Sequence, residues 1–327
     1  MRPRFRLRFA TVLVALLTVF IGAPSYNIGR AVATESSRQS EGKTLAERLG
    51  YSKDAKLLII HADDLGVAHS VNAASLKALD SGAITSGSIM MPCPWITEIA
   101  AYMRTHPDAD LGLHLTLTSE WQSYRWGPVA SKDKVHSLLD REGYLYPTEG
   151  EAASHMDPRE AEIEIRAQVE RALALGIHPT HLDAHMGTLF RTKPLFEALL
   201  RVAHDYHLPF LDATDFFVEG PYLKASLGPN DVVIDHMTTI SPSVTPDHWA
   251  DFYRDAIKNL KPGVTEFIIH LGYDDAEMQA ITVNHPDWGA AWRQRDFNFF
   301  TSPECRKILE ENDVKLVTWR QSGKLVQ

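Results

Sequence analysis

The most informative segment of the chain reads Ile59-Ile60-His61-Ala62-Asp63-Asp64-Leu65-Gly66. An apolar run, Leu57–Ile60, leads into two adjacent carboxylates and then a glycine, a pattern that predicts a buried strand opening into a loop. Like charges this close raise each other's pKa unless a cation shares the site. Asp63 and Asp64 are therefore candidates for a metal ligand and a neighbouring base. The alternative is structural, since Asp-Asp pairs are also typical of turns and helix caps.

The N-terminal segment has the pattern of a secretory signal. Four arginines precede the apolar run Phe9–Ala23, and Ala31-Val32-Ala33 has the small-x-small form of a cleavage site. We predict a signal peptide over residues 1–33, a polar linker over 34–56 and one domain over 57–327. The protein is expected to be exported, to the periplasm or the extracellular space. A membrane anchor is the alternative if the segment is not cleaved, although its apolar run is short for a transmembrane helix.

Length and charge limit the classes of function. The chain has 327 residues, 44% of them hydrophobic, which is enough for one large α/β domain or two smaller ones. Its formal net charge of −9 argues against nucleic acid as a partner, because phosphate binding needs a basic surface. Cys93 and Cys305 are the only cysteines, and the sequence leaves open whether they pair.

Short apolar runs alternate with amphipathic stretches from residue 57 to residue 319. The clearest helix has Asp157 as N-cap, Pro158 next, Glu160 at the third position and Gly176 just past its end, with Ile163 among its packing residues. Repeated strand–helix alternation predicts an α/β fold with parallel strands, either a doubly wound sheet or a barrel. Strands are expected at Leu57–Ile60, Ile84–Met91, Leu111–Leu117, Thr180–Asp183, Pro209–Leu211, Val232–Ile234, Glu266–Ile269 and Val314–Trp319.

Imidazole and carboxylate side chains recur at the carboxyl ends of these predicted strands. In Leu111-Gly112-Leu113-His114-Leu115-Thr116-Leu117, a period of two puts the leucines on one face and His114 on the other. In His181-Leu182-Asp183-Ala184-His185 the same period aligns two imidazoles and a carboxylate. Active sites of parallel α/β folds are built at this edge. The set suits a divalent metal with open positions, and a buried hydrogen-bond cluster is the alternative.

The chain resembles the YdjC-like carbohydrate deacetylases, the family of chitooligosaccharide deacetylase. The resemblance rests on four motifs in family order: His61-Ala62-Asp63-Asp64-Leu65-Gly66, Gly112-Leu113-His114-Leu115, Pro179-Thr180-His181-Leu182-Asp183-Ala184-His185 and Glu266-Phe267-Ile268-Ile269-His270-Leu271-Gly272-Tyr273. Arg166 and Gln168 also fit. The family implies a single (β/α) barrel-like domain, with an incomplete or distorted barrel of seven to eight strands. It also implies hydrolysis of an N-acetyl group from an amino sugar or oligosaccharide.

The resemblance further implies a metal centre and an acid–base pair. Asp64, His114 and His185 are expected to bind a divalent metal ion, Mg²⁺ or Zn²⁺, whose identity the ligand types leave open. Asp63 is expected to be the general base and His270 the general acid for the departing amine. Residues expected to orient a ligand or contact substrate are His61, His181, Asp183, Trp121, Tyr124 and Trp126. The three aromatic residues have core packing as an equal alternative.

Three positions depart from the family pattern. His61 stands where the family usually has asparagine, Leu65 where phenylalanine is common, and Leu271 where proline usually follows the late histidine. A third imidazole near the metal is able to act as a ligand or to change substrate contacts. His61 therefore weakens any inference about the substrate.

Two other functions use the same residues. A non-haem iron oxygenase binds its metal through two histidines and one carboxylate, but leaves the adjacent Asp63 without a role. A non-catalytic sugar-binding protein is the second alternative. The sequence does not determine substrate length, linkage or oligomeric state.

Overall fold

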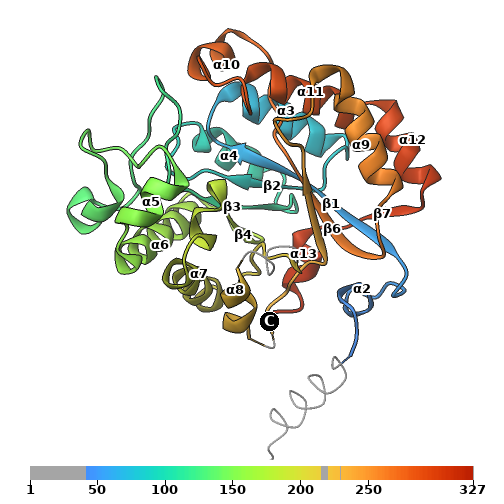
Figure 1. The fold of residues 1–327 in the computed structure, drawn as a ribbon, viewed down its shortest axis with the longest axis horizontal. Helices are drawn as coiled ribbons and strands as arrows, with labels where there is room; N and C mark the ends of the chain where they lie inside the picture. Colours follow the sequence, from blue (N-terminus) through green and yellow to red (C-terminus); the bar gives the residue numbers. More distant parts are fainter. Residues whose placement is uncertain (1–41, 215–219, 229, 327) are drawn as a thin grey trace, which may run out of the picture. The chain divides into compact units, whose positions relative to one another are not determined.

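The computed structural model describes residues 42–214, 220–228 and 230–326 (Figure 1). In the compact unit that begins at Lys43, parallel strands form a curved sheet with helices packed around its outside (Figure 1). The strands are β1 (Lys56–Leu65), β2 (Ser86–Ile89), β3 (Leu111–Leu115), β4 (Leu182–Ala184), β5 (His236–Thr239), β6 (Gly263–Ile269) and β7 (Val314–Leu316).

Helices of very different length connect the strands. The longer ones are α3 (His69–Asp80), α4 (Ile96–Met103), α6 (Pro158–Ala174), α7 (Lys193–Asp205), α9 (Trp249–Lys258), α11 (Ala290–Phe300) and α12 (Pro303–Glu311). The shorter ones are α2 (Leu45–Arg48), α5 (Glu149–His155), α8 (Pro221–Ser226), α10 (Ala276–Ile281) and α13 (Trp319–Gly323). In Figure 1, α9, α11 and α12 lie on one side of the strands and α5 to α8 on the other.

The strand order is β4-β3-β2-β1-β6-β5, and β7 pairs with β1. Strand β1 is central because it pairs with β6 along most of its length, with β7 near its start and with β2 near its end. All of these pairings are parallel. The prediction of a barrel-like α/β domain with an incomplete barrel is confirmed.

Side chains of β1 alternate between two layers of the core. Even-numbered positions join the core beneath the helices, and odd-numbered positions join the core enclosed by the curved sheet. The even positions are Leu58, Ile60 and Ala62, and the odd ones Leu57 and Ile59. His61 and Asp63 continue the odd face. The enclosed surface therefore changes from apolar to polar toward the carboxyl end, where the site lies.

Two predicted strands are wrong. Pro209–Leu211 and Val232–Ile234 form only isolated bridges. Strand β5 begins at His236, two residues after the second predicted strand ends. The side chain of Asp235 accepts a hydrogen bond of 2.8 Å from the backbone N–H of Val264. That donor is therefore taken by a side chain, and the regular ladder with β6 starts only after Asp235.

Helix α6 begins as predicted but buries a different face. The Asp157 side chain accepts a hydrogen bond of 2.8 Å from Arg159 N, and Pro158 is the first helical residue. The expected packing residue Ile163 is 40% exposed. The buried stripe instead follows the i, i+4 spacing through Ala161, Ile165, Gln168, Val169 and Ala172.

The predicted linker contains a packed helix. Thr44 and Glu47 form a capping box at the start of α2, and Leu45 and Ala46 are buried in the core enclosed by the sheet. The compact unit begins at Lys43 rather than at Leu57 for this reason.

The prediction of an exported protein is corrected. Among residues 42–214, 220–228 and 230–326, no helix is both long and apolar enough to cross a membrane. The predicted signal peptide, residues 1–33, lies outside the described residues. The assignment to the periplasm or the extracellular space, and that of a membrane anchor, therefore have no structural support and are withdrawn.

The two cysteines do not pair. Cys93 lies between β2 and α4, and Cys305 lies in α12. Both are buried free thiols in the core beneath the helices. Burial raises the pKa of both, so neither has the thiolate character of a reactive cysteine.

Candidate metal centre and active site

Asp63 and Asp64 at the end of β1 direct their side chains to the same site. Neighbouring side chains of a regular strand point to opposite faces. The register between β1 and β2 shifts between Ala62 and Leu65, and Asp64 has a φ of 69°. This left-handed conformation is uncommon outside glycine but tolerated by aspartate. The bulge re-aims the Asp64 carboxylate to the side of the sheet where Asp63 already lies.

The first group of possible metal ligands consists of Asp64, His114 and His185, which we call the outer cluster. One ligand atom of each lies within 4.8 Å of the others. Asp64 Oδ1 is 3.4 Å from His114 Nε2 and 3.4 Å from His185 Nδ1, yet this buried oxygen has no hydrogen-bond partner. Buried carboxylate oxygens are normally satisfied. The three residues therefore fit a divalent cation held by two imidazoles and a carboxylate.

Carboxylates hold both outer histidines through their other ring nitrogens. His114 Nδ1 lies 2.5 Å from Asp183 Oδ1, and His185 Nε2 lies 3.1 Å from Glu120 Oε2. An N–H donated to each carboxylate leaves His114 Nε2 and His185 Nδ1 directed at Asp64. This carboxylate–histidine arrangement is the usual support of metal-binding imidazoles.

The charges of the outer cluster shift its pKa values strongly. Burial opposes ionisation of Asp64, but the Arg293 guanidinium and the imidazoles of His185 and His270 hold its pKa well below its usual range. Burial likewise disfavours a charged His185, but Glu120 and Asp64 raise its pKa to about 10. The pKa of His114 is also raised, against the effect of burial, mainly by Asp183. The site thus attracts positive charge.

Arg293 in α11 is a buried cation that the sequence analysis missed. Its Nη2 donates a hydrogen bond of 2.6 Å to Asp64 Oδ2, and its Nε donates one of 2.6 Å to the Trp288 carbonyl. Its Nη1 is buried without a hydrogen-bond partner. The guanidinium also lies 5.7 Å from the centre of the Trp121 ring. No motif quoted in the sequence analysis includes this residue, which lies in a helix far along the chain.

Asp63 and His270 lie beside the outer cluster. Asp63 Oδ2 is 3.7 Å from His114 Nε2 and 3.8 Å from His270 Nε2. The backbone N–H of His270 donates a hydrogen bond of 3.0 Å to Asp296 Oδ2. Burial lowers the pKa of His270 to about 4, although Asp64 and Asp63 oppose this shift. The imidazole is therefore neutral at pH 7.

Comparison with known proteins identifies the family. The sequence profile of YdjC-like proteins matches residues 57–311. A carbohydrate deacetylase of Thermus thermophilus is 33% identical over 84% of this chain and 97% of its own length. One of Thermoanaerobacter pseudethanolicus is 28% identical over 81% of this chain and 98% of its own length.

The chain belongs to the YdjC-like family. The resemblance predicted from the four motifs is confirmed. A crystal structure of a putative cellobiose-phosphate cleavage protein from Enterococcus faecalis has the same fold. Its TM-score is 0.69, at 24% identity, over 81% of this chain and 98% of that one.

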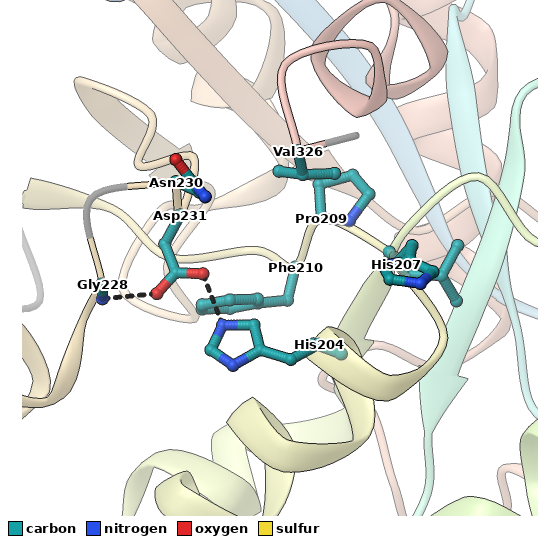
Figure 2. A pocket seen from close by; sticks show the side chains of 10 residues that line it. His204, His207, Pro209, Phe210, Gly228, Asn230, Asp231 and Val326 are labelled. Carbon is teal, nitrogen blue, oxygen red and sulfur yellow. Dashed lines mark hydrogen bonds and ion pairs between the residues drawn. The ribbon is translucent and has the colours of Figure 1, made fainter. Parts of the chain in front are cut away.

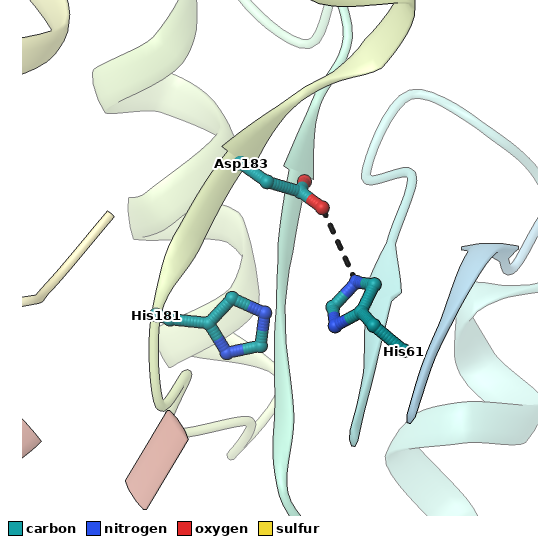
Figure 3. Close-up of side chains that lie close together, drawn as sticks. All are labelled: His61, His181 and Asp183. Atoms are coloured by element: carbon teal, nitrogen blue, oxygen red, sulfur yellow. Dashed lines mark ion pairs between the residues drawn. The ribbon is translucent and has the colours of Figure 1, made fainter. Parts of the chain in front are cut away.

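His61 forms a second group with His181 and Asp183, which we call the inner cluster. One ligand atom of each lies within 4.8 Å of the others, and all three residues are buried. Figure 3 shows His61 and Asp183 facing each other, with the His181 ring alongside. His61 Nε2 is 3.2 Å from Asp183 Oδ2. The inner cluster lies nearer the amino ends of β1 and β4 than the outer one.

Further carboxylates surround His61. Its Nδ1 is 3.3 Å from Glu266 Oε1, and its Nε2 is 3.1 Å from Asp63 Oδ1. Burial opposes a charged imidazole, but Glu266, Asp183 and Asp63 raise the pKa of His61 well above its usual value. Burial in turn raises the pKa of Glu266 to about 8. By contrast, burial holds the pKa of His181 well below its usual value.

Leu65 and Leu271, the other two positions expected to depart from the family pattern, are packed in the core. Leu65 and Leu271 are both fully buried in the core beneath the helices. Neither brings a polar atom to the site.

The predicted aromatic platform is mostly buried. Trp121 and Trp126 are 2% and 5% exposed, with ring centres 5.7 Å apart in an edge-to-face contact. Trp126 Nε1 donates to the Thr118 carbonyl, and the half-buried Tyr124 donates its hydroxyl to the Val67 carbonyl. These contacts favour a packing role beside the outer cluster for the two tryptophans.

Arg166 and Gln168 in α6 have different surroundings. Gln168 is buried and forms two hydrogen bonds with the backbone of Thr116, of 3.0 and 2.8 Å, just after β3. It therefore fixes the chain that follows His114. Arg166 pairs with Glu162 and Asp205 near the surface. It makes no contact with either cluster.

A cavity of about 280 Å³ shares no residue with either cluster. It lies at the end of α7 beside the segment 207–210 (Figure 2). His204 Nε2 and Asp231 Oδ1 form an ion pair of 2.7 Å on its wall, and Gly228 N donates to the other oxygen of Asp231. His204 and Asp231 are therefore paired with each other rather than directed at a ligand.

Proposed function

We propose that this YdjC-like protein is a metal-dependent carbohydrate deacetylase that releases acetate from an N-acetylated amino sugar or oligosaccharide. Its curated relatives carry the name carbohydrate deacetylase, which makes a hydrolase acting on an amide bond the function supported best. We assign residues 57–327 to the deacetylase domain. One observation carries the proposal. Asp63 is a carboxylate outside the outer cluster, and its Oδ2 lies 3.7 Å from His114 Nε2, a proposed ligand atom of that cluster.

Asp64, His114 and His185 would hold the metal. A divalent ion at this position supplies Lewis-acid chemistry that polarises an acetamide carbonyl and makes water more acidic. Two imidazoles and one carboxylate suit zinc, and Mg²⁺ is the other metal we consider. Glu120 and Asp183 orient the two imidazoles through their second nitrogens.

Asp63 is proposed to act as the general base. Its Oδ2 takes a proton from water as the water oxygen bonds to the acetyl carbon, and the carbon–nitrogen bond then breaks. The products are acetate and a free amine. Ser88 and His61 hold the other oxygen, Oδ1, through contacts of 3.3 and 3.1 Å. Asp63 is therefore fixed with one oxygen free for the reaction.

His270 is proposed to deliver a proton to the departing amine. Its Nε2 lies 3.8 Å from Asp63 Oδ2, so a proton held by Asp63 is one transfer away from it. Because the His270 pKa is lowered to about 4, the resting imidazole is neutral and gains its proton during the reaction. Asp296 fixes the backbone of His270 and thereby the position of its ring.

Substitution of the proposed base tests this function. Asp63→Asn keeps the side-chain volume, so we expect metal content and fold to persist while acetate release falls by about 10²- to 10⁴-fold. Acetate release is measured on N-acetylglucosamine and its oligosaccharides after chelation and add-back of Zn²⁺ or Mg²⁺. Asp108→Asn, an exposed position, is the matched control and should release acetate at the unaltered rate. Unchanged acetate release by Asp63→Asn contradicts the proposed base.

A further inference from the structure

We propose that the inner cluster of His61, His181 and Asp183 binds a second divalent metal ion of the first transition row, with zinc as the best match. This ion would lie beneath the outer cluster, inside the curved sheet. The proposal depends only on the geometry of the inner cluster. It therefore stands whether or not the chain deacetylates sugars.

The inner cluster repeats the geometric signature of the outer one. His61 Nε2 approaches Asp183 Oδ2 to 3.2 Å, yet this buried oxygen has no hydrogen-bond partner. In the outer cluster, Asp64 Oδ1 has the same relation to two imidazole nitrogens. A carboxylate oxygen that is close to an imidazole nitrogen but not hydrogen-bonded to it is able to accept a metal ion instead.

His181 offers a free nitrogen at a fixed position. Thr180 Oγ1 lies 3.0 Å from His181 Nδ1, and the ring stacks on Trp319 with centres 5.1 Å apart. Gly112 also lies against the ring, since a β-carbon there would be 2.5 Å from its atoms. His181 Nε2 is buried and has no hydrogen-bond partner. A buried imidazole nitrogen without a partner is costly unless it binds something.

The charge balance around the inner cluster also favours a cation. Four acidic side chains are buried near the two clusters, Asp63, Asp64, Asp183 and Glu266. Arg293 is the one buried Arg or Lys side chain among the described residues, and it pairs with Asp64. Buried charges are normally paired or bind metals. A divalent ion in the inner cluster would balance these carboxylates in place of a protonated His61 beside Asp183.

Asp183 connects the two proposed ions. Its Oδ1 accepts from His114 Nδ1, whereas its Oδ2 faces His61. Ser88 Oγ forms a hydrogen bond of 3.0 Å with His61 Nε2, and an ion in the inner cluster would replace that contact. An ion in the inner cluster would therefore fix the Asp183 carboxylate, which orients His114 of the outer cluster. Asp183 would then contribute to both metal sites.

Metal stoichiometry tests the proposal directly. The purified full chain is stripped with a chelator, dialysed against Zn²⁺, and analysed for zinc per chain by mass spectrometry. We expect two ions per chain. Anomalous scattering from zinc in crystals should then give two peaks, one between Asp64, His114 and His185 and the other between His61, His181 and Asp183.

Paired variants assign each ion to its cluster. His61→Asn and His181→Gln should each reduce the content from two ions to one while retaining the outer peak. His185→Gln should also leave one ion, at the inner cluster. Binding there is then measured in a variant that lacks a ligand of the proposed catalytic metal, so it does not depend on the proposed function. His136→Gln, an exposed histidine, is the control and should retain two. Circular dichroism and thermal unfolding verify that each variant is folded.

Two outcomes would overturn the proposal. One is a single zinc ion per unaltered chain with no anomalous density between His61, His181 and Asp183; His61 would then be a protonated imidazole paired with carboxylates. The other is an unchanged content of two ions in folded His61→Asn and folded His181→Gln. Loss of acetate release by Asp63→Asn has no bearing on either outcome.

Discussion

The outer and inner clusters contain the same residue types, two histidines and one aspartate, but differ in their surroundings. In the outer cluster Asp64 is paired with the Arg293 guanidinium, and the ring of His270 nearby is 13% exposed. In the inner cluster His61 and His181 are fully buried, and the neighbouring charged groups are carboxylates. The outer cluster thus combines a fixed counter-charge with a partly exposed neighbouring imidazole.

The difference suggests a division between chemistry and support. A catalytic metal site needs open positions for water and substrate, whereas a structural site is closed. Asp63 and His270 lie beside the outer cluster, and the His270 side chain is 13% exposed. Trp319 and Gly112 close the inner cluster. Substitutions are therefore able to change one cluster while leaving the residues of the other in place.

The largest expected effect is on catalysis and comes from the outer cluster. His185→Gln removes a proposed metal ligand, and loss of several kcal/mol of charge stabilisation corresponds to a fall in acetate release of about 10³-fold. His61→Asn should reduce acetate release much less, because it leaves the three outer ligands in place. The rates are compared on N-acetylglucosamine oligosaccharides with saturating Zn²⁺. Equal losses in the two variants would show that the clusters do not divide these roles.

The next effect is on stability and concerns the built-in cation. Arg293→Met leaves Asp64 as a buried charge without its partner, which should lower the free energy of unfolding by about 3–5 kcal/mol. Urea unfolding of the chelator-treated protein measures this loss. Arg306→Met, an exposed position in α12, is the control and should change little. Added Zn²⁺ should reduce the difference in free energy of unfolding between Arg293→Met and the unaltered chain, since an ion in the outer cluster also compensates Asp64. An unchanged difference would count against Asp64 as a metal ligand.

A buried carboxyl group outside both clusters, that of Asp212, is expected to make the stability of the protein depend on pH. Asp212 is buried without a hydrogen-bond partner among the described residues, and burial raises its pKa to about 7. The folded protein therefore retains a proton that the unfolded chain loses near pH 4. This stabilisation is complete below pH 4 and is lost as the pH rises toward 7, by a few kcal/mol.

Asp212→Asn should remove this dependence. The free energy of unfolding of the variant, relative to that of the unaltered chain, is expected to be higher at pH 8 than at pH 5. Urea unfolding at the two pH values measures this change. In the two clusters, by contrast, the pKa of Asp64 and that of Asp183 are lowered despite burial, because cationic or imidazole groups lie beside them. A constant difference between variant and unaltered chain across this pH range would contradict the raised pKa of Asp212.

The smallest expected effect tests the packing of the inner cluster. Gly112→Ala places a β-carbon 2.5 Å from the His181 ring, so the ring must move, at a cost of about 1–3 kcal/mol. Gly150→Ala in α5 meets no atom within 4 Å and should not destabilise the protein. Thermal unfolding compares the two variants. If Gly112→Ala is as stable as Gly150→Ala, His181 is less firmly fixed than the stacking on Trp319 implies.

The sequence predicted the parallel α/β fold because period-two apolar runs and helix caps depend on neighbouring residues alone. It also brought Asp63, His114, Asp183 and His270 to one edge, since the carboxyl ends of parallel strands meet there. It failed for the strands at Pro209–Leu211 and Val232–Ile234. Apolar composition does not show whether a backbone donor is taken by a side chain, as that of Val264 is by Asp235.

Alternation along the chain, read from sequence alone, placed His114 on the polar face of its strand and aligned His181, Asp183 and His185. Only the tertiary structure decided that Asp64 points to the same side as Asp63, because a bulge with a left-handed residue reverses the alternation of β1. Only the fold could bring Arg293, 229 positions later in the chain, to Asp64. Local patterns fix which way a side chain points, but the partners of a buried charge depend on contacts between distant segments.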